Sequence, residues 1–201
     1  MNLTMSFFNF YFQEGIHHIL TLEASDHIMF VVALMAIYQL KDWRRVLVLI
    51  TAFTIGHSLT LALSGLGVVS FKTNVVELLV AITVFLTGAF NLGQKLPMAK
   101  RLSVMARVMR YGIAFVFGLI HGLAFSGRLR GMFSDKDFLW PLFGFNLGLE
   151  IGQIVIVLLI LLLSFVFIRF LQKREHDWNV LLSGAAMGIS LFLILQRMQT
   201  V

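Results

Sequence analysis

Long apolar segments separated by short polar loops run along the whole chain of 201 residues. Each apolar segment has close to the ~20 residues that a helix needs to cross the hydrocarbon core of a bilayer. The pattern predicts an all-α fold, a polytopic membrane protein with a bundle of about six transmembrane helices. No polar stretch is long enough for a second unit, so residues 1–201 are expected to form a single transmembrane domain. The predicted spans are Gly15–Tyr38, Arg45–Leu63, Asn74–Leu92, Met109–Phe125, Leu139–Phe170 and Trp178–Leu195, of which the fifth is long enough to tilt or bend.

The distribution of basic residues predicts the orientation of these helices. Eleven of the sixteen Lys and Arg residues follow the first, third and fifth spans: Lys41, Arg44, Arg45, Lys95, Lys100, Arg101, Arg107, Arg110, Arg169, Lys173 and Arg174. The other five lie on the opposite side: Lys72, Arg128, Arg130, Lys136 and Arg197. Because short cytoplasmic loops carry the excess of Lys and Arg, both termini are expected outside, in the periplasm of a bacterial inner membrane. The net charge of +6 is therefore a topology signal and not the signature of a nucleic-acid partner.

Ionisable side chains interrupt four of the apolar segments. Asp26 with His27, His57, His121 and Glu150 each fall about eleven or twelve residues into a predicted span. At a rise of ~1.5 Å per residue, all of them reach the middle of the bilayer or its outer half. Ionisable groups in hydrocarbon are costly and mark a functional site by default, and His, Asp and Glu are ligands of divalent metals. We therefore expect an intramembrane metal or proton site, with interhelical hydrogen bonds as the alternative role for each residue taken singly.

Several of these residues have candidate helpers on the same predicted span. Adjacent positions on a helix point about 100° apart, so one of Asp26 and His27 is expected to bind an ion while the other orients a ligand. His18 and Ser25 lie seven residues apart, which places them on one face of the first predicted helix and makes His18 a candidate for ion capture. Ser58 directly follows His57.

A polar stripe is predicted on the fifth span. Asn146, Glu150 and Gln153 are spaced four and three residues apart, so they share one helix face and could form the wall of a hydrophilic pathway. A buried network that ties helices together is the competing interpretation. Glu77, near the outer end of the third span, is either a favourable acid in the first turn of a helix or part of an entrance.

Rows of small residues predict where helices approach one another closely. Three rows have the four-residue spacing that lets helix backbones come together: Gly118, Gly122 and Ser126; Gly144, Gly148 and Gly152; Gly184 and Gly188. Spans four, five and six are therefore expected to pack through these faces.

Five motifs together resemble the HupE/UreJ family. They are Gly15-x-x-His18-Ile19, Ser25-Asp26-His27-Ile28-x-Phe30, Phe53-Thr54-x-Gly56-His57-Ser58-x-Thr60-Leu61, Phe117-Gly118-Leu119-x-His121-Gly122-x-x-Phe125, and Phe145-Asn146-x-Gly148-x-Glu150-x-Gly152-Gln153. The resemblance covers the first five spans. It implies a small polytopic membrane protein, a nickel or cobalt permease linked to the maturation of hydrogenase and urease.

The combined prediction is a membrane transporter for a divalent transition metal ion (Ni, Co or Zn). Without cysteine, thiolate ligands are excluded, and imidazole ligands favour Ni²⁺. The expected metal residues are Asp26, His27, His57, His121, Glu150 and His18; the expected pathway or supporting residues are Ser25, Ser58, Glu77, Asn146 and Gln153. The expected partners are the lipid bilayer and the metal ion, with a homo-oligomer left open.

Two other functions fit the same residues. In an intramembrane zinc-dependent metallohydrolase, the His, Asp and Glu cluster would hold Zn²⁺ and activate water, and Ser25 or Ser58 would stabilise an oxyanion. In a metal sensor or assembly scaffold, the cluster would bind the ion without turnover. An ATPase is not indicated, because the chain has no Gly-rich phosphate loop of the Walker type.

Overall fold

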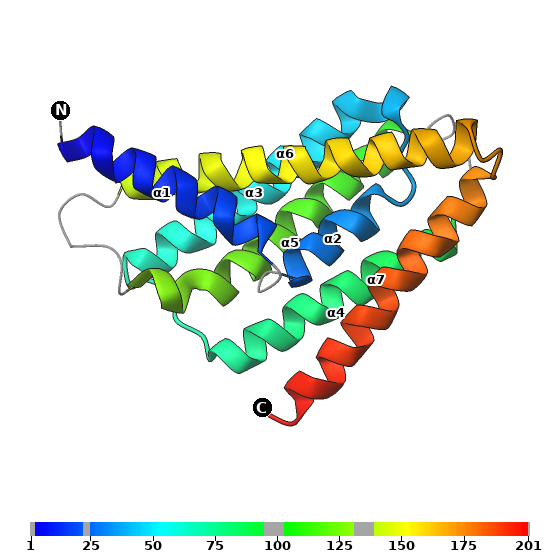
Figure 1. Cartoon of the computed structure of the whole chain (residues 1–201). Coiled ribbons are helices and arrows are strands. Elements are labelled where there is room, and N and C mark those ends of the chain that lie inside the picture. Colours follow the sequence, from blue (N-terminus) through cyan, green and yellow to red (C-terminus); the bar gives the residue numbers. More distant parts are fainter. Residues whose placement is uncertain (1–2, 22–24, 95–102, 131–138, 201) are drawn as a thin grey trace.

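All regular secondary structure in the described part of the chain is helical. A computed structural model describes residues 3–21, 25–94, 103–130 and 139–200 (Figure 1). In chain order these residues form α1 (Leu3–Leu20), α2 (Ser25–Met35), the short 3-10 helix η2 (Leu40–Asp42), α3 (Trp43–Gly65), α4 (Thr73–Leu92), α5 (Val104–Arg130), α6 (Leu139–Arg169) and α7 (Glu175–Met198). The predicted all-α fold is confirmed, and α6 is a single helix of 31 residues.

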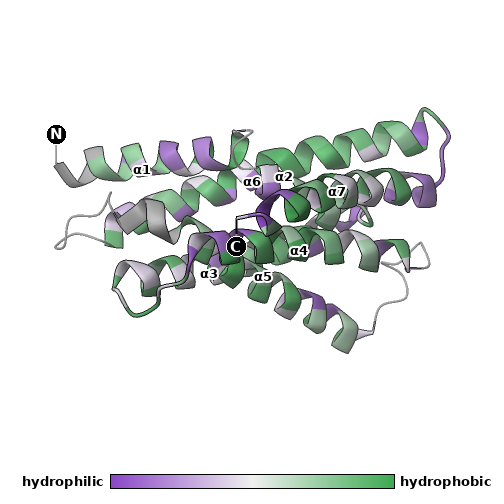
Figure 2. Cartoon of the chain, turned by 90° about the horizontal axis from the view of Figure 1, so that it is seen from below, coloured by the Kyte–Doolittle hydropathy of each residue, from purple (hydrophilic) through white to green (hydrophobic). Residues whose placement is uncertain are grey.

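Five of these helices, α3 to α7, are long and apolar enough to cross a membrane, and α1 with α2 adds a sixth candidate span if the two count together. Many large hydrophobic side chains on these helices are exposed, as expected of surfaces that face lipid. Figure 2 shows that hydrophobic residues predominate along the helices. The fourth predicted span ends at Phe125, whereas α5 continues as a helix to Arg130.

The first predicted span is not one continuous helix. The chain forms α1 and α2 instead, and their axes are inclined by 69°. Asp26 therefore lies in the first turn of a new helix, where its Oδ1 accepts a hydrogen bond at 2.8 Å from the backbone N–H of His27. A helix N-terminus has unpaired N–H groups and a positive dipole end, and a carboxylate stabilises both. Hydropathy alone does not indicate that a new helix begins here, because the segments before and after this point are both apolar.

Two pairs of helices are held together through glycine. A Cβ atom at Gly56 of α3 would clash with the carbonyl oxygen of Phe115 on α5, and one at Gly118 of α5 would clash with that of Phe53 on α3. A Cβ atom at Gly122 would meet the carbonyl oxygen of His57. The residue numbers in contact increase together along the two helices, so α3 and α5 run parallel. Their backbones are closer than a residue with a side chain would allow at these glycine positions.

The helices α1 and α6 repeat the same construction. A Cβ atom at Gly15 would clash with the carbonyl oxygen of Phe145, and one at Gly148 with that of Phe12. Figure 1 shows α1 lying along α6. The predicted close packing of the glycine rows on the fourth and fifth spans is therefore confirmed at Gly118 and Gly148.

The predicted close packing through the glycine row of the last span is wrong. A Cβ atom at Gly184 or Gly188 would meet nothing within 4 Å. The helix α7 packs on α4 through another glycine, Gly88, where a Cβ atom would lie 2.9 Å from the carbonyl oxygen of Ser183. A row of small residues shows that close helix packing is sterically possible, but the neighbouring helix decides which face of the helix it packs against.

A candidate metal centre

The side chain of His27 lies buried at the start of α2. Its Nδ1 is 2.9 Å from Oδ1 of Asp26. An ionised carboxylate can only accept hydrogen bonds, so Nδ1 carries the proton and donates it. The remaining ring nitrogen, Nε2, is buried and has no hydrogen-bond partner among the described residues. Of the two predicted roles, Asp26 thus takes that of orienting the imidazole.

His57 is fully buried on α3, and Asn146 of α6 holds its ring. Nδ1 of His57 is 3.3 Å from Oδ1 of Asn146, whose amide nitrogen donates to the carbonyl oxygen of Leu142. Since the amide nitrogen is used in this way, Oδ1 is the acceptor and Nδ1 of His57 is the donor. Nε2 of His57 is buried and lacks a hydrogen-bond partner within the described chain.

His121 is fully buried on α5 and is held by Thr83 of α4. The Thr83 hydroxyl donates at 2.7 Å to the carbonyl oxygen of Val80, so it accepts from Nε2 of His121, which is 3.1 Å away. This leaves Nδ1 of His121 as the nitrogen without a proton, again with no hydrogen-bond partner in the described part of the chain.

Three helices thus bring three imidazoles into one region. The ring centroid of His27 lies 4.9 Å from that of His121 and 5.9 Å from that of His57. Each ring donates one N–H to the protein and keeps one bare, buried nitrogen. A metal-binding imidazole is oriented in this way, by a hydrogen bond from the nitrogen that does not bind the metal.

Aromatic rings enclose this histidine cluster, defined as His27, His57 and His121. The rings of Phe30 and Phe53 lie 5.1 Å from that of His121, and the ring of Phe145 lies 6.5 Å from that of His57. An apolar wall of this kind lowers the local dielectric, which strengthens every electrostatic interaction inside it.

The fourth predicted histidine stands at the edge of the cluster. His18 of α1 is partly buried, and its ring centroid is 5.0 Å from that of His27 and 4.1 Å from that of Phe125. The predicted common helix face of His18 and Ser25 is wrong, because the two residues belong to helices inclined by 69°. The close approach of His18 to His27 comes from that bend.

No three His, Asp or Glu side chains of the described residues already stand in an arrangement that could hold a metal ion. The ring centroid of His27 is 4.9 Å from that of His121 and 5.9 Å from that of His57, and the ring planes are crossed at 86° and 76°. Binding an ion at the ~2.0–2.1 Å typical of imidazole ligands therefore requires these side chains to rearrange.

The polar stripe of α6 lies against α3, but its members reach different depths. Asn146 contacts His57, Gln153 accepts a hydrogen bond at 3.0 Å from Thr54, and Glu150 accepts one at 2.7 Å from Thr51. Thr51 lies six residues before His57, nearly two helical turns away. The structure thus brings Asn146 to the histidine cluster, whereas the carboxylate of Glu150 is held elsewhere on α3.

Two further predicted residues have partners outside the cluster. The hydroxyl of Ser58 donates at 2.6 Å to the carbonyl oxygen of Thr54, one turn earlier on the same helix. Glu77 lies near the start of α4, and its Oε2 is 3.6 Å from Nε of Arg197.

No sequence pattern indicates a role for Arg197, which the structure places against the site. From the last turn of α7, its Nη2 lies 3.2 Å from Oδ2 of Asp26, and its Nη1 donates at 2.7 Å to the carbonyl oxygen of Glu77. Thr83 was also missed, because a threonine on an apolar helix commonly bonds to its own backbone. Only the packing of α4 and α7 against α2 and α5 gives these side chains their roles.

Comparison with known proteins agrees with the sequence motifs. Neither a curated protein nor a solved structure matches the chain significantly. A family model described as HupE / UreJ protein matches residues 2–198, nearly the whole length. Together with the all-helical fold and its long apolar helices, this match shows that the chain is a membrane protein belonging to the HupE/UreJ family.

Proposed function

We propose that this protein moves a divalent transition metal ion of the nickel and cobalt type across the bacterial inner membrane. In this proposal His27, His57 and His121 bind the ion in passage. The observation that carries the proposal is the set of three bare ring nitrogens, all buried and all on rings whose other nitrogen donates to the protein. The family resemblance supports the choice of metal.

Energetics support a ligand for these nitrogens. A buried polar atom left without a hydrogen bond costs about 1–3 kcal/mol, so three in one region are a substantial combined penalty. If these three positions served packing alone, apolar side chains of similar size could fill them without that penalty. A metal ion needs neutral imidazoles with a free lone pair, and the hydrogen bond at the other nitrogen of each ring fixes which nitrogen offers that lone pair.

The pairing of Asp26 with Arg197 fits temporary binding. The carboxylate is shared between His27 and the guanidinium at 2.9 and 3.2 Å. A carboxylate that is already neutralised attracts a cation less strongly, and the ion can leave more readily. A transport site has to release its cargo, so moderate affinity suits this function better than a permanent metal site.

Uptake into proteoliposomes tests the proposal. We expect vesicles with the purified wild-type chain to accumulate Ni²⁺ from outside, and vesicles with His121→Ala to accumulate it no faster than empty vesicles. Glu150→Gln distinguishes a metal ligand from a pathway residue. Because the carboxylate of Glu150 bonds to Thr51, we expect the variant to bind Ni²⁺ normally but to take it up more slowly, which would assign Glu150 to the pathway. Equal uptake by wild-type and empty vesicles would refute transport of this metal.

We further propose that both termini face the periplasm, on the evidence of the basic residues. Alkaline phosphatase, which is active only outside the cytoplasm, is expected to be active when fused after Val201. A fluorescent reporter that folds only in the cytoplasm should be dark at the same position. The reverse pair of results would overturn the orientation.

A further inference from the structure

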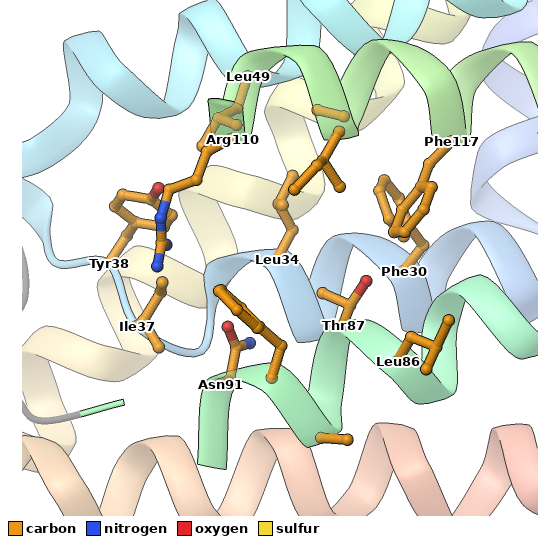
Figure 3. Close-up of a pocket in the computed structure, with 14 residues that line it drawn as sticks. Phe30, Leu34, Ile37, Tyr38, Leu49, Leu86, Thr87, Asn91, Arg110 and Phe117 are labelled. Atoms are coloured by element: carbon orange, nitrogen blue, oxygen red, sulfur yellow. The ribbon is translucent and has the colours of Figure 1, made fainter. Parts of the chain in front are cut away.

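A cavity separate from the histidine cluster opens between α2, α4 and α5. It has a volume of about 370 Å³ (Figure 3). This lies within the range of about 300–1,000 Å³ in which proteins bind small molecules. Its wall is formed mainly by apolar side chains, among them Leu34, Ile37, Leu49 and Ile113. The rings of Phe30 and Phe117 also line it, and Phe30 lies 5.1 Å from His121, so aromatic rings separate the cavity from the cluster.

The two ends of the cavity differ in polarity. Tyr38, Asn91 and Arg110 lie at one end, and Phe30 and Phe117 lie at the other (Figure 3). The polar end lies near the last turn of α4 and the second turn of α5. A molecule that fills this space would have a polar or anionic end and an apolar tail.

The charge at the polar end belongs to Arg110. Its guanidinium carbon lies 5.5 Å from the centre of the Phe90 ring, and the side chain is partly exposed. A guanidinium has five N–H donors in a planar fork, and this geometry suits phosphate oxygens. The same positive charge makes this cavity unsuitable as a route for a divalent cation.

The cavity is reached from the side of the bundle. Three of its lining residues, Leu86 and Phe90 on α4 and Ile113 on α5, are 52%, 56% and 44% exposed. These positions belong to helices that qualify as membrane spans, so the surface around the opening is one that lipid covers. A hydrocarbon chain can enter from the bilayer without crossing water.

We propose that this cavity binds an anionic phospholipid, with one acyl chain between α4 and α5 and the phosphate at Arg110. Basic pockets between transmembrane helices are known to hold acidic headgroups. The acyl chain would cover the apolar wall from Leu34 to Phe117, and the phosphate would stay at the level of the basic loops. The proposal does not depend on the metal cargo, because no residue of the histidine cluster lines the cavity.

Lipid binding to the full-length, delipidated protein in detergent tests this site. The probes are dioleoyl phosphatidylglycerol and dioleoyl phosphatidylcholine, and bound lipid is counted by native mass spectrometry. The wild-type protein should prefer the anionic lipid. Arg110→Gln should weaken phosphatidylglycerol binding about fivefold while leaving phosphatidylcholine binding unchanged, since one basic residue contributes about 1 kcal/mol to an anionic headgroup.

Arg44→Gln is the matched control. Arg44 is exposed, belongs to the same basic end of the bundle and stacks at 5.2 Å on the ring of Trp43, but does not line the cavity. It should bind both lipids as the wild type does. A loss equal to that of Arg110→Gln would indicate general surface attraction and overturn the site.

Two further arms test the acyl chain. Ala89→Phe adds a ring to the cavity wall and should lower the binding of both long-chain lipids. Inorganic phosphate and dihexanoyl phosphatidylglycerol should bind weakly, and competition as strong as that of the long-chain lipid would mean a free-anion site and refute the proposal.

If Arg110→Gln fails to fold, the wild-type preference for phosphatidylglycerol over phosphatidylcholine still decides, and equal binding overturns the inference.

Discussion

Replacing any one of His27, His57 and His121 by Ala is expected to lower the affinity for Ni²⁺ by more than about 100-fold. Loss of a residue that only supports a ligand typically costs about 10–100-fold, and loss of a ligand costs more. The three rings supply the bare nitrogens of the site, and no cysteine is present to replace them. Isothermal titration of the purified, metal-free protein in detergent measures the effect.

Three variants show whether the loss is specific. His17→Ala removes an exposed histidine next to His18 and should bind Ni²⁺ as the wild type does. Thr83→Val removes the acceptor for His121 and should cost about 10–100-fold. Thr87→Val is an equal change at a hydroxyl that donates to the carbonyl oxygen of Thr83 on its own helix, and it should leave the affinity unchanged.

The opposite pattern would assign the histidines to the fold. If the three alanine variants bind Ni²⁺ normally but unfold at lower temperature, the cluster serves packing. If Thr83→Val and Thr87→Val behave alike, the hydrogen bond to His121 has no part in binding.

The substitution Gly118→Ala is expected to destabilise the protein strongly. A Cβ atom there would clash with the carbonyl oxygen of Phe53 and lie 3.1 Å from the backbone nitrogen of His57. Backbone atoms cannot rotate away, so α3 and α5 must move apart. Overpacking typically costs about 1–3 kcal/mol, and we expect the upper end of that range or more.

A matched control exists on the same helix. A Cβ atom at Gly112 would meet nothing within 4 Å, so Gly112→Ala should be neutral or stabilise α5 by up to about 1 kcal/mol. Unfolding in mixed micelles with increasing SDS compares the two variants. Gly118→Ala should also weaken Ni²⁺ binding, because the helix pair sets the separation of His57 and His121. Equal stability of Gly112→Ala and Gly118→Ala would mean that the helices do not pack through glycine.

Some properties of this protein follow from local sequence. Hydropathy over about 20 residues predicts membrane spans because every backbone polar group in a bilayer must be paired within a helix. The same reasoning singled out Asp26, His27, His57 and His121 as costly residues in apolar segments, and the structure brings them together. The close approach at Gly118 and Gly148 was also predictable, since only small side chains permit it.

Other features depend on neighbours that are distant in the sequence. The inclination of α1 to α2 escaped prediction because a helix start marked by one acid, Asp26, leaves average hydropathy unchanged. The partners of Glu150 and His121 depend on how α3 and α4 are turned about their axes, which periodicity does not specify. Arg197 lies 171 residues from Asp26 in the chain and meets it only because α7 packs against α4. Local composition determines which segments enter the membrane, whereas the contacts between helices decide which polar groups face one another.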